Sequence, residues 1–269
     1  MLANAKNGTL RLSCGAMHYV RFGKGKKTLV MLPGLGDGLT TVKGTAVPMA
    51  MMYRIFSKDY TVYMFSRCNA LPSGSTTRGM ARDLKEALDA LSIAKCDVFG
   101  VSMGGMIAQH FAADYPEMVS RLVLCVTSAQ PNDTLKESVQ EWIALAGSGD
   151  HAAFMDSNVR RMYSDAYYRR NKWLIPLISK LTKPKSYERF FIQANACLTH
   201  DAADRLPHIS APTLVIGGAQ DRALSPDASR EIAAAIPRAK LKMYSEWGHG
   251  LYEEAKDFNR SVLQFLTED

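Results

Sequence analysis

A serine stands between two glycines at residues 100–104, and its surroundings could make it a nucleophile. Gly100-x-Ser102-x-Gly104 follows an apolar run (96–101) and precedes a run suited to a helix (103–115). A sharp strand-to-helix turn exposes such a serine, and it needs glycines because side chains would clash there. The spacing therefore predicts a nucleophilic Ser102, provided that a base and an acid lie downstream.

The best candidate for the base is His249. It lies in Ser245-Glu246-Trp247-Gly248-His249-Gly250, after the last expected strand, and the glycines on both sides let the imidazole project into a crevice. A loop histidine without a role is the alternative. The other histidines fall in an early strand, in the helix after Ser102, or in and beside the segment 131–205; they are His18, His110, His151, His200 and His208.

Asp221 is the expected partner of His249. It follows the strand expected at 213–216, so it too lies at the carboxyl end of a strand. A carboxylate bonded to one imidazole nitrogen fixes the tautomer, leaving the other nitrogen to accept the serine proton. Asp221 could instead be a turn residue or a helix N-cap. The competing acids are Asp227, which follows a proline and begins the next helix, and more weakly Asp133 and Asp204.

Two backbone amides could stabilise the oxyanion that such chemistry creates. Met103 directly follows the nucleophile at a helix N-terminus, and Leu35 lies in the loop Pro33-Gly34-Leu35-Gly36 after a buried strand. Gly34 is also a candidate substrate-binding residue. A glycine-rich loop could bind phosphate instead, but this one has neither the P-loop lysine nor dinucleotide-binding spacing.

The elements that must position these residues alternate between strand and helix. Alternation of this kind predicts a mostly parallel sheet with helices on both faces. Apolar runs predict strands at 9–12, 16–22, 28–32, 61–65, 97–101, 122–126, 213–216 and 240–244, and helical periodicity predicts helices at 80–91, 103–115, 229–236 and 258–266.

The segment 131–205 has helical patterns and no clear strand. We expect it to be a helical cap over the carboxyl ends of the strands, where ligands bind in α/β sheets, with residues 1–130 and 206–269 forming the core domain. Its larger side chains could line an apolar acyl pocket; the alternative, which is the more ordinary role for any one of them, is to pack the cap onto the core. The candidate substrate-binding residues there are Trp142, Met155 and Trp173, beside Phe154, Met162, Phe190 and Phe191.

Composition limits the other classes of function. The net charge is +7, and residues 151–200 hold nine Lys and Arg against three Asp and Glu, which could steer anions. No nucleic-acid motif accompanies these bases. No run reaches the roughly 18 apolar residues of a membrane span, and no secretory signal is recognisable, so we expect a cytoplasmic protein. Five cysteines without metal-ligand spacing predict reduced thiols and no metal site.

The order Ser102, Asp221, His249, with a helical insertion after the sixth strand, resembles the α/β-hydrolase family. The resemblance implies an eight-stranded sheet and a cofactor-free hydrolase that forms an acyl-enzyme. In that scheme Ser102 is the nucleophile, His249 the base and Asp221 its orienting acid, with Leu35 and Met103 as oxyanion donors. Two departures touch the scaffold: members usually have His-Gly at Pro33-Gly34, and many have Asp-Arg at Ser66-Arg67.

Several subclasses are excluded by this sequence. A haloalkane dehalogenase needs aspartate in place of Ser102, and lipase-type esterases carry a His-Gly-Gly-Gly loop. We therefore expect a hydrolase of small to medium carboxylic esters, whose partner is a small-molecule substrate. The alternatives are hydrolysis of lactones or carbon–carbon bonds with the same triad, and a ligand-binding or signalling protein with a slow triad. The oligomeric state is left open.

Overall fold

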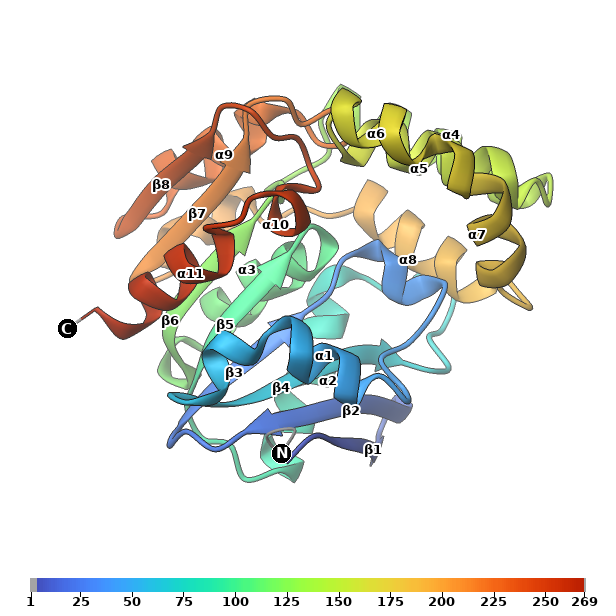
Figure 1. Ribbon diagram of the computed structural model, residues 1–269. Coiled ribbons are helices and arrows are strands. Elements are labelled where there is room, and N and C mark those ends of the chain that lie inside the picture. Colours follow the sequence, from blue (N-terminus) through green and yellow to red (C-terminus); the bar gives the residue numbers. More distant parts are fainter. Residues whose placement is uncertain (1–3, 269) are drawn as a thin grey trace.

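The computed structural model describes residues 4–268, and within them eight strands form one sheet (Figure 1). The strand order is β1-β2-β4-β3-β5-β6-β7-β8. β2 pairs antiparallel with β1 and β4, and every pair from β4–β3 to β7–β8 is parallel. The strands are Lys6–Leu12 (β1), Gly15–Gly23 (β2), Lys27–Leu32 (β3), Tyr60–Cys68 (β4), Cys96–Val101 (β5), Val119–Cys125 (β6), Thr213–Gly218 (β7) and Ala239–Tyr244 (β8).

Helices cover both faces of the sheet, which is why the central strands are continuous apolar runs rather than alternating ones. Every residue of β5 and β7 is buried. One apolar layer packs α2 (Thr77–Ala90), α3 (Met103–Asp114) and α9 (Pro226–Ala235) onto the sheet. The opposite layer packs α1 (Ala46–Met52), α10 (Leu251–Glu254) and α11 (Phe258–Thr267).

A helical cap leaves the core between β6 and β7, as expected. Polar side chains start three of its helices by accepting the backbone amide three residues on: Asn132 before α4, Asp150 before α5 and Ser164 before α6. The cap helices are Asp133–Gly147 (α4), His151–Met162 (α5), Asp165–Asn171 (α6), Ile175–Thr182 (α7) and Glu188–Leu198 (α8). In Figure 1 they arch over the carboxyl ends of the strands.

The predicted and observed elements differ mainly at their ends. The helix predicted at 80–91 starts one turn earlier, because the Thr76 side chain accepts the Gly79 amide and caps it. The short helices α1 and α10 and the 3-10 turns were not predicted, since segments this short have no measurable period. The turns are Leu35–Gly38 (η1), Arg54–Ser57 (η2), Pro116–Met118 (η3), Lys172–Leu174 (η4) and Ala203–His208 (η5).

Two of the five cysteines are joined, which corrects the expectation of reduced thiols. Cys14 and Cys68 form a disulfide across 54 residues, whereas Cys96, Cys125 and Cys197 are free and buried. The turn after β1 meets the end of β4 because β2 lies between these strands and pairs with both. Such a pairing depends on sheet order and cannot be read from cysteine spacing.

Within residues 4–268, every helix is too short or too polar to cross a bilayer.

Candidate active site

Ser102 occupies the sharp turn between β5 and α3 in a backbone conformation that L-residues seldom adopt (φ 54°, ψ −121°). The turn closes because the Ser102 amide donates to the Cys125 carbonyl at 2.9 Å. Glycine is required on both sides: a Cβ on Gly104 would lie 2.0 Å from the Leu32 carbonyl oxygen, and one on Gly100 would lie 2.5 Å from that of Gly104. The motif therefore forms the expected turn and places Ser102 at the carboxyl end of a central strand.

His249 and Asp221 meet, although 28 residues separate them. His249 Nδ1 lies 2.8 Å from Asp221 Oδ2, and both side chains are buried. The other carboxylate oxygen of Asp221 accepts the Ala223 and Leu224 amides at 2.8 and 2.9 Å, which fixes its orientation. With Nδ1 committed to the carboxylate, Nε2 is the imidazole nitrogen left to exchange a proton.

The competing acids lie elsewhere. Asp227 pairs with Arg230 at the surface, Asp133 is almost fully exposed beside Lys136, and Asp204 is exposed.

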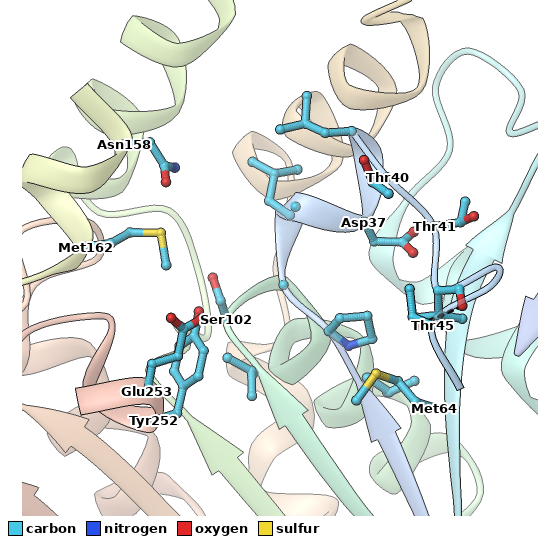
Figure 2. A pocket seen from close by; sticks show the side chains of 18 of the residues that line it. Asp37, Thr40, Thr41, Thr45, Met64, Ser102, Asn158, Met162, Tyr252 and Glu253 are labelled. Carbon is cyan, nitrogen blue, oxygen red and sulfur yellow. Dashed lines mark hydrogen bonds between the residues drawn. The ribbon is translucent and has the colours of Figure 1, made fainter. Parts of the chain in front are cut away.

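Ser102 and His249 line one cavity between the core and the cap. Within residues 4–268 no hydrogen bond joins the Ser102 hydroxyl to His249, a separation common in sites without substrate. Figure 2 shows the Ser102 hydroxyl pointing into the cavity, with Asn158 and Met162 extending from the cap and Tyr252 and Glu253 approaching from α10.

The loop after β3 passes directly over Ser102. A Cβ on Gly34 would lie 3.3 Å from Ser102 Cβ, which is closer than most Cβ contacts, so glycine at this position leaves more room beside the nucleophile. Within the described chain, the Leu35 and Met103 amides donate to no other protein group. The two amides are thus available to an oxygen bound beside Ser102.

A buried charge cluster, which sequence reasoning missed, supports this loop. Arg67 donates from Nη2 to the Pro33 carbonyl at 2.5 Å and from its backbone amide to Asp37 Oδ2 at 3.1 Å. Arg189, on cap helix α8, donates to the same Asp37 oxygen and, at 2.7 Å, to the Cys68 carbonyl. Gln193 approaches Asp37 Oδ2 at 3.3 Å.

The sequence has Pro33-Gly34 where members of the family usually have His-Gly, so the support of this loop was expected to differ. Arg67 provides that support here. Burial lowers the pKa of Arg67, and Asp37 opposes that shift. Nothing in the local sequence of Asp37 or Arg189 signals their meeting.

The cavity has a volume of about 540 Å³ and an apolar wall. Of the candidate substrate-binding residues, Gly34, Trp142 and Met155 line it, and Trp173 does not, since it is 72% exposed on the outer surface of the cap. Within the described residues no Lys or Arg lines the cavity, whereas Asp37, whose carboxylate is paired with Arg189, and Glu253 do. The basic charge of the cap thus lies outside the cavity.

Glu253 links the loop that carries His249 to the cap. Tyr163 donates its hydroxyl to Glu253 at 2.6 Å, Ser164 donates its amide and hydroxyl to Glu254, and Gly250 donates its amide to the Met162 carbonyl. Glu253 is open to the cavity, yet desolvation by the surrounding protein raises its pKa, aided by Glu254 and opposed by the Tyr163 hydrogen bond. Nothing in the sequence around Tyr163 or Glu253 predicts that the two residues form a hydrogen bond.

One further cluster of possible metal ligands lies outside the cavity. Cys14, Cys68 and Asp83 bring their ligand atoms within 4.8 Å of one another. The two sulfurs are bonded to each other, so the thiolates that a metal would need are absent in this form.

Comparison with known proteins agrees with the fold. Residues 27–256 match the family described as alpha/beta hydrolase fold. A 2-hydroxy-6-oxononadienedioate/2-hydroxy-6-oxononatrienedioate hydrolase of Paraburkholderia xenovorans is 30% identical over 263 residues, covering 93% of this chain and 90% of its own. The protein of the same name from Cupriavidus pinatubonensis is 32% identical over 262 residues, with 93% and 90% covered.

A crystal structure of an α/β-hydrolase enzyme from a Medee basin deep-sea metagenome library matches with a TM-score of 0.84 at 25% identity, covering 97% of this chain and 98% of that one. The chain therefore belongs to the α/β-hydrolase fold family.

Proposed function

We propose that the protein is a serine hydrolase that cleaves neutral carboxylic esters of small to medium size through an acyl-enzyme on Ser102. The observation that carries the proposal is that Ser102, on its strained turn, and His249, paired with Asp221, line the same apolar cavity.

The reaction follows from these groups. His249 Nε2 takes the Ser102 proton as Oγ attacks the ester carbonyl, and the Leu35 and Met103 amides stabilise the resulting oxyanion. The intermediate collapses as the C–O bond breaks and His249 protonates the departing alcohol. Water then attacks the acyl-enzyme, giving its proton to His249, and the carboxylic acid leaves as Ser102 regains a proton.

The cavity wall supports a neutral substrate. A carboxylate moved from water into an apolar cavity needs a partner, and no Lys or Arg lines this one within residues 4–268. The guanidinium groups of Arg67 and Arg189 face Asp37 and donate to backbone carbonyls.

Hydrolysis of a carbon–carbon bond is the second candidate, because the named relatives at 30–32% identity act on dienedioates. A dienedioate carries two carboxylates, and the cavity wall offers them no cation. The proposal therefore favours esters, with neutral lactones as the nearest extension, since they contain the same bond.

A graded substrate panel tests this choice. Neutral p-nitrophenyl esters of increasing length, a neutral lactone, an ester bearing a free carboxylate and a 2-hydroxy-6-oxo-dienedioate are compared by kcat/KM. We expect neutral esters to be turned over and the carboxylate-bearing substrates to be poor. Ser102→Ala should lower kcat by about 10³-fold or more, whereas Ser148→Ala, at the exposed end of α4, should not.

Ester turnover that survives in Ser102→Ala would refute the acyl-enzyme. Preference for the dienedioate would replace the proposal by carbon–carbon hydrolysis, and a folded wild type that hydrolyses nothing on the panel would favour a binding or signalling role.

A further inference from the structure

The outer end of the cap exposes large apolar side chains. Helix α7 packs on α5 through Ile175 and Ser179, which are buried. The apolar face of α7, including the preceding tryptophan, points away from the protein; it consists of Trp173 (72% exposed), Leu177 (56%), Ile178 (39%) and Leu181 (78%). Single exposed apolar residues are ordinary, but four within nine residues form a patch that needs an occupant. In Figure 1 α7 lies at the edge of the cap, away from the sheet.

Basic residues, here called the basic rim, flank this apolar face along the chain. Residues 166–187 contain six Lys and Arg and no Asp or Glu. All six are exposed and make no ion pair with any described residue; they are Arg169, Arg170, Lys172, Lys180, Lys183 and Lys185. The rim is therefore a source of positive charge that nothing within the described chain neutralises.

We infer that the apolar face of α7 and its basic rim dock on the surface of an anionic lipid bilayer. An interfacial helix of this kind buries apolar side chains at the boundary between headgroups and acyl chains, while Lys and Arg contact anionic headgroups. Trp173, the most exposed of the aromatic residues beside α7, is the residue type that membrane interfaces favour.

Charge argues against the other occupants. A second copy of this chain seated on the same face would bring two basic rims together, and opposed like charges weaken such an interface. A nucleic acid would satisfy the bases but would leave Leu177, Ile178 and Leu181 against phosphates rather than against an apolar phase.

Docking would place the catalytic cavity beside the lipid phase. Helix α7 ends at Thr182, which lines the cavity and hydrogen-bonds to His151, another lining residue. A substrate dissolved among acyl chains could then enter without crossing much water. This last step rests on the proposed ester hydrolysis, whereas the docking itself does not.

The test measures docking without catalysis, by sedimenting the full-length Ser102→Ala protein with vesicles. Vesicles of phosphatidylcholine alone are compared with vesicles of equal phosphatidylcholine and phosphatidylglycerol. We expect binding to the anionic vesicles, weakened by added salt, with a blue shift of tryptophan fluorescence that is lost in Trp173→Phe.

Substitutions identify the surface. Leu177→Ser/Leu181→Ser and, separately, Lys180→Gln/Lys185→Gln should each lower the vesicle partition coefficient by about tenfold or more. The matched controls are Leu241→Ser, which is 43% exposed on β8, and Lys24→Gln/Lys26→Gln in the turn after β2; both should bind as the parent does.

Three outcomes would overturn the inference: no binding to anionic vesicles at low salt, binding that neither α7 variant weakens, or a dimer in solution that Leu177→Ser/Leu181→Ser converts to a monomer. The substrate panel is unaffected by any of them, so this inference and the proposed function can fail separately.

Discussion

At the scale of single residues, the site depends on a strained serine and on glycines that make room for it. Ser102 has a positive φ, and strain of this kind persists only where the surroundings enforce it. Gly104 lets α3 approach the end of β3, so the helix that begins at Met103 can start directly behind the nucleophile. The geometry of the nucleophile thus depends on Gly104, two residues away, because this position has no side chain.

Gly104→Ala tests that dependence. Its Cβ would meet the Leu32 carbonyl oxygen at 2.0 Å, so we expect a loss of about 3 kcal/mol or more in the free energy of unfolding, or failure to fold. Gly147→Ala is the matched control, because nothing lies within 4 Å of its Cβ in helix α4. That change should be neutral or stabilising by up to about 1 kcal/mol. Equal effects in urea denaturation would show that the close approach is unimportant.

The sequence is informative about residues whose role is local. Ser102, Asp221 and His249 each follow a recognisable strand, and a parallel sheet gathers such strand ends at one edge. The structure pairs His249 with Asp221 as predicted; the catalytic roles stay predictions. Asp37, Arg67 and Arg189 could not be grouped in advance, because Asp37 meets partners 30 and 152 residues away.

At the scale of elements, two of the polar junctions between the cap and the core lie beside the proposed active site. Asp37 in η1 meets Arg189 on α8, and Glu253 on α10 meets Tyr163 between α5 and α6. Each junction joins a cap element to a segment that carries part of the site, the oxyanion loop in the first case and the His249 loop in the second. A movement of the cap would therefore displace both the oxyanion loop and the loop that carries His249.

Asp37→Asn should destabilise the protein strongly. Among the described residues, Asp37 is the one carboxylate that pairs with Arg67 and Arg189, and a buried charge left without its partner costs about 3–5 kcal/mol. The control is Asp156→Asn, which removes a carboxylate from the exposed Arg160 pair and should have a much smaller effect. The comparison uses urea unfolding midpoints at unchanged slope; similar losses in the two variants would contradict the role of the cluster.

Prediction of elements from sequence succeeds where the pattern is long. Strands 97–101 and 213–216 and the helix 103–115 lie within one or two residues of β5, β7 and α3. It fails for α1 and α10, which span seven and four residues and are held by packing against the sheet. Trp173 was expected to line the substrate pocket but lies on the outer surface of the cap. The sequence pattern can show that a segment has an apolar face, but not whether that face points inward.

At the scale of the whole molecule, two buried histidines make stability depend on pH. The rings of His110 on α3 and His200 after α8 pack edge to face with their centroids 5.2 Å apart, and His200 is hydrogen-bonded to Thr77 on α2. Burial lowers the pKa of His110 to about 4; burial and the neighbouring His110 lower that of His200 to about 3. Both are therefore neutral in the folded protein near pH 7.

We expect acid to destabilise the protein from about pH 6.5 downward. Below that pH these histidines become protonated in the unfolded chain but stay neutral in the folded protein. The free energy of unfolding therefore falls as the pH is lowered toward 4. The slope approaches about 1.4 kcal/mol per pH unit for each histidine. Urea titrations from pH 7 to 5 measure it.

His110→Gln/His200→Gln is the control for this slope. We expect the free energy of unfolding of this double variant to depend less steeply on pH, even if its stability at pH 7 differs from that of the parent. Burial also lowers the pKa values of His18 and His151, but these residues are present in both proteins and leave the same residual slope in each. An unchanged slope in the double variant would exclude this pair as the source.

The position of the cap between β6 and β7 has a consequence for how such proteins diversify. The two ends of the cap meet, because the Ala202 amide donates to the Ala129 carbonyl at 2.8 Å, so the chain leaves and re-enters the core at adjacent points. Recombination could exchange the intervening segment whole, and the recipient would keep its bond-breaking residues while acquiring a new preference for substrate or surface. The exchange carries one condition: the incoming segment must supply a cation where Arg189 reaches Asp37, or the inherited oxyanion loop loses part of its support.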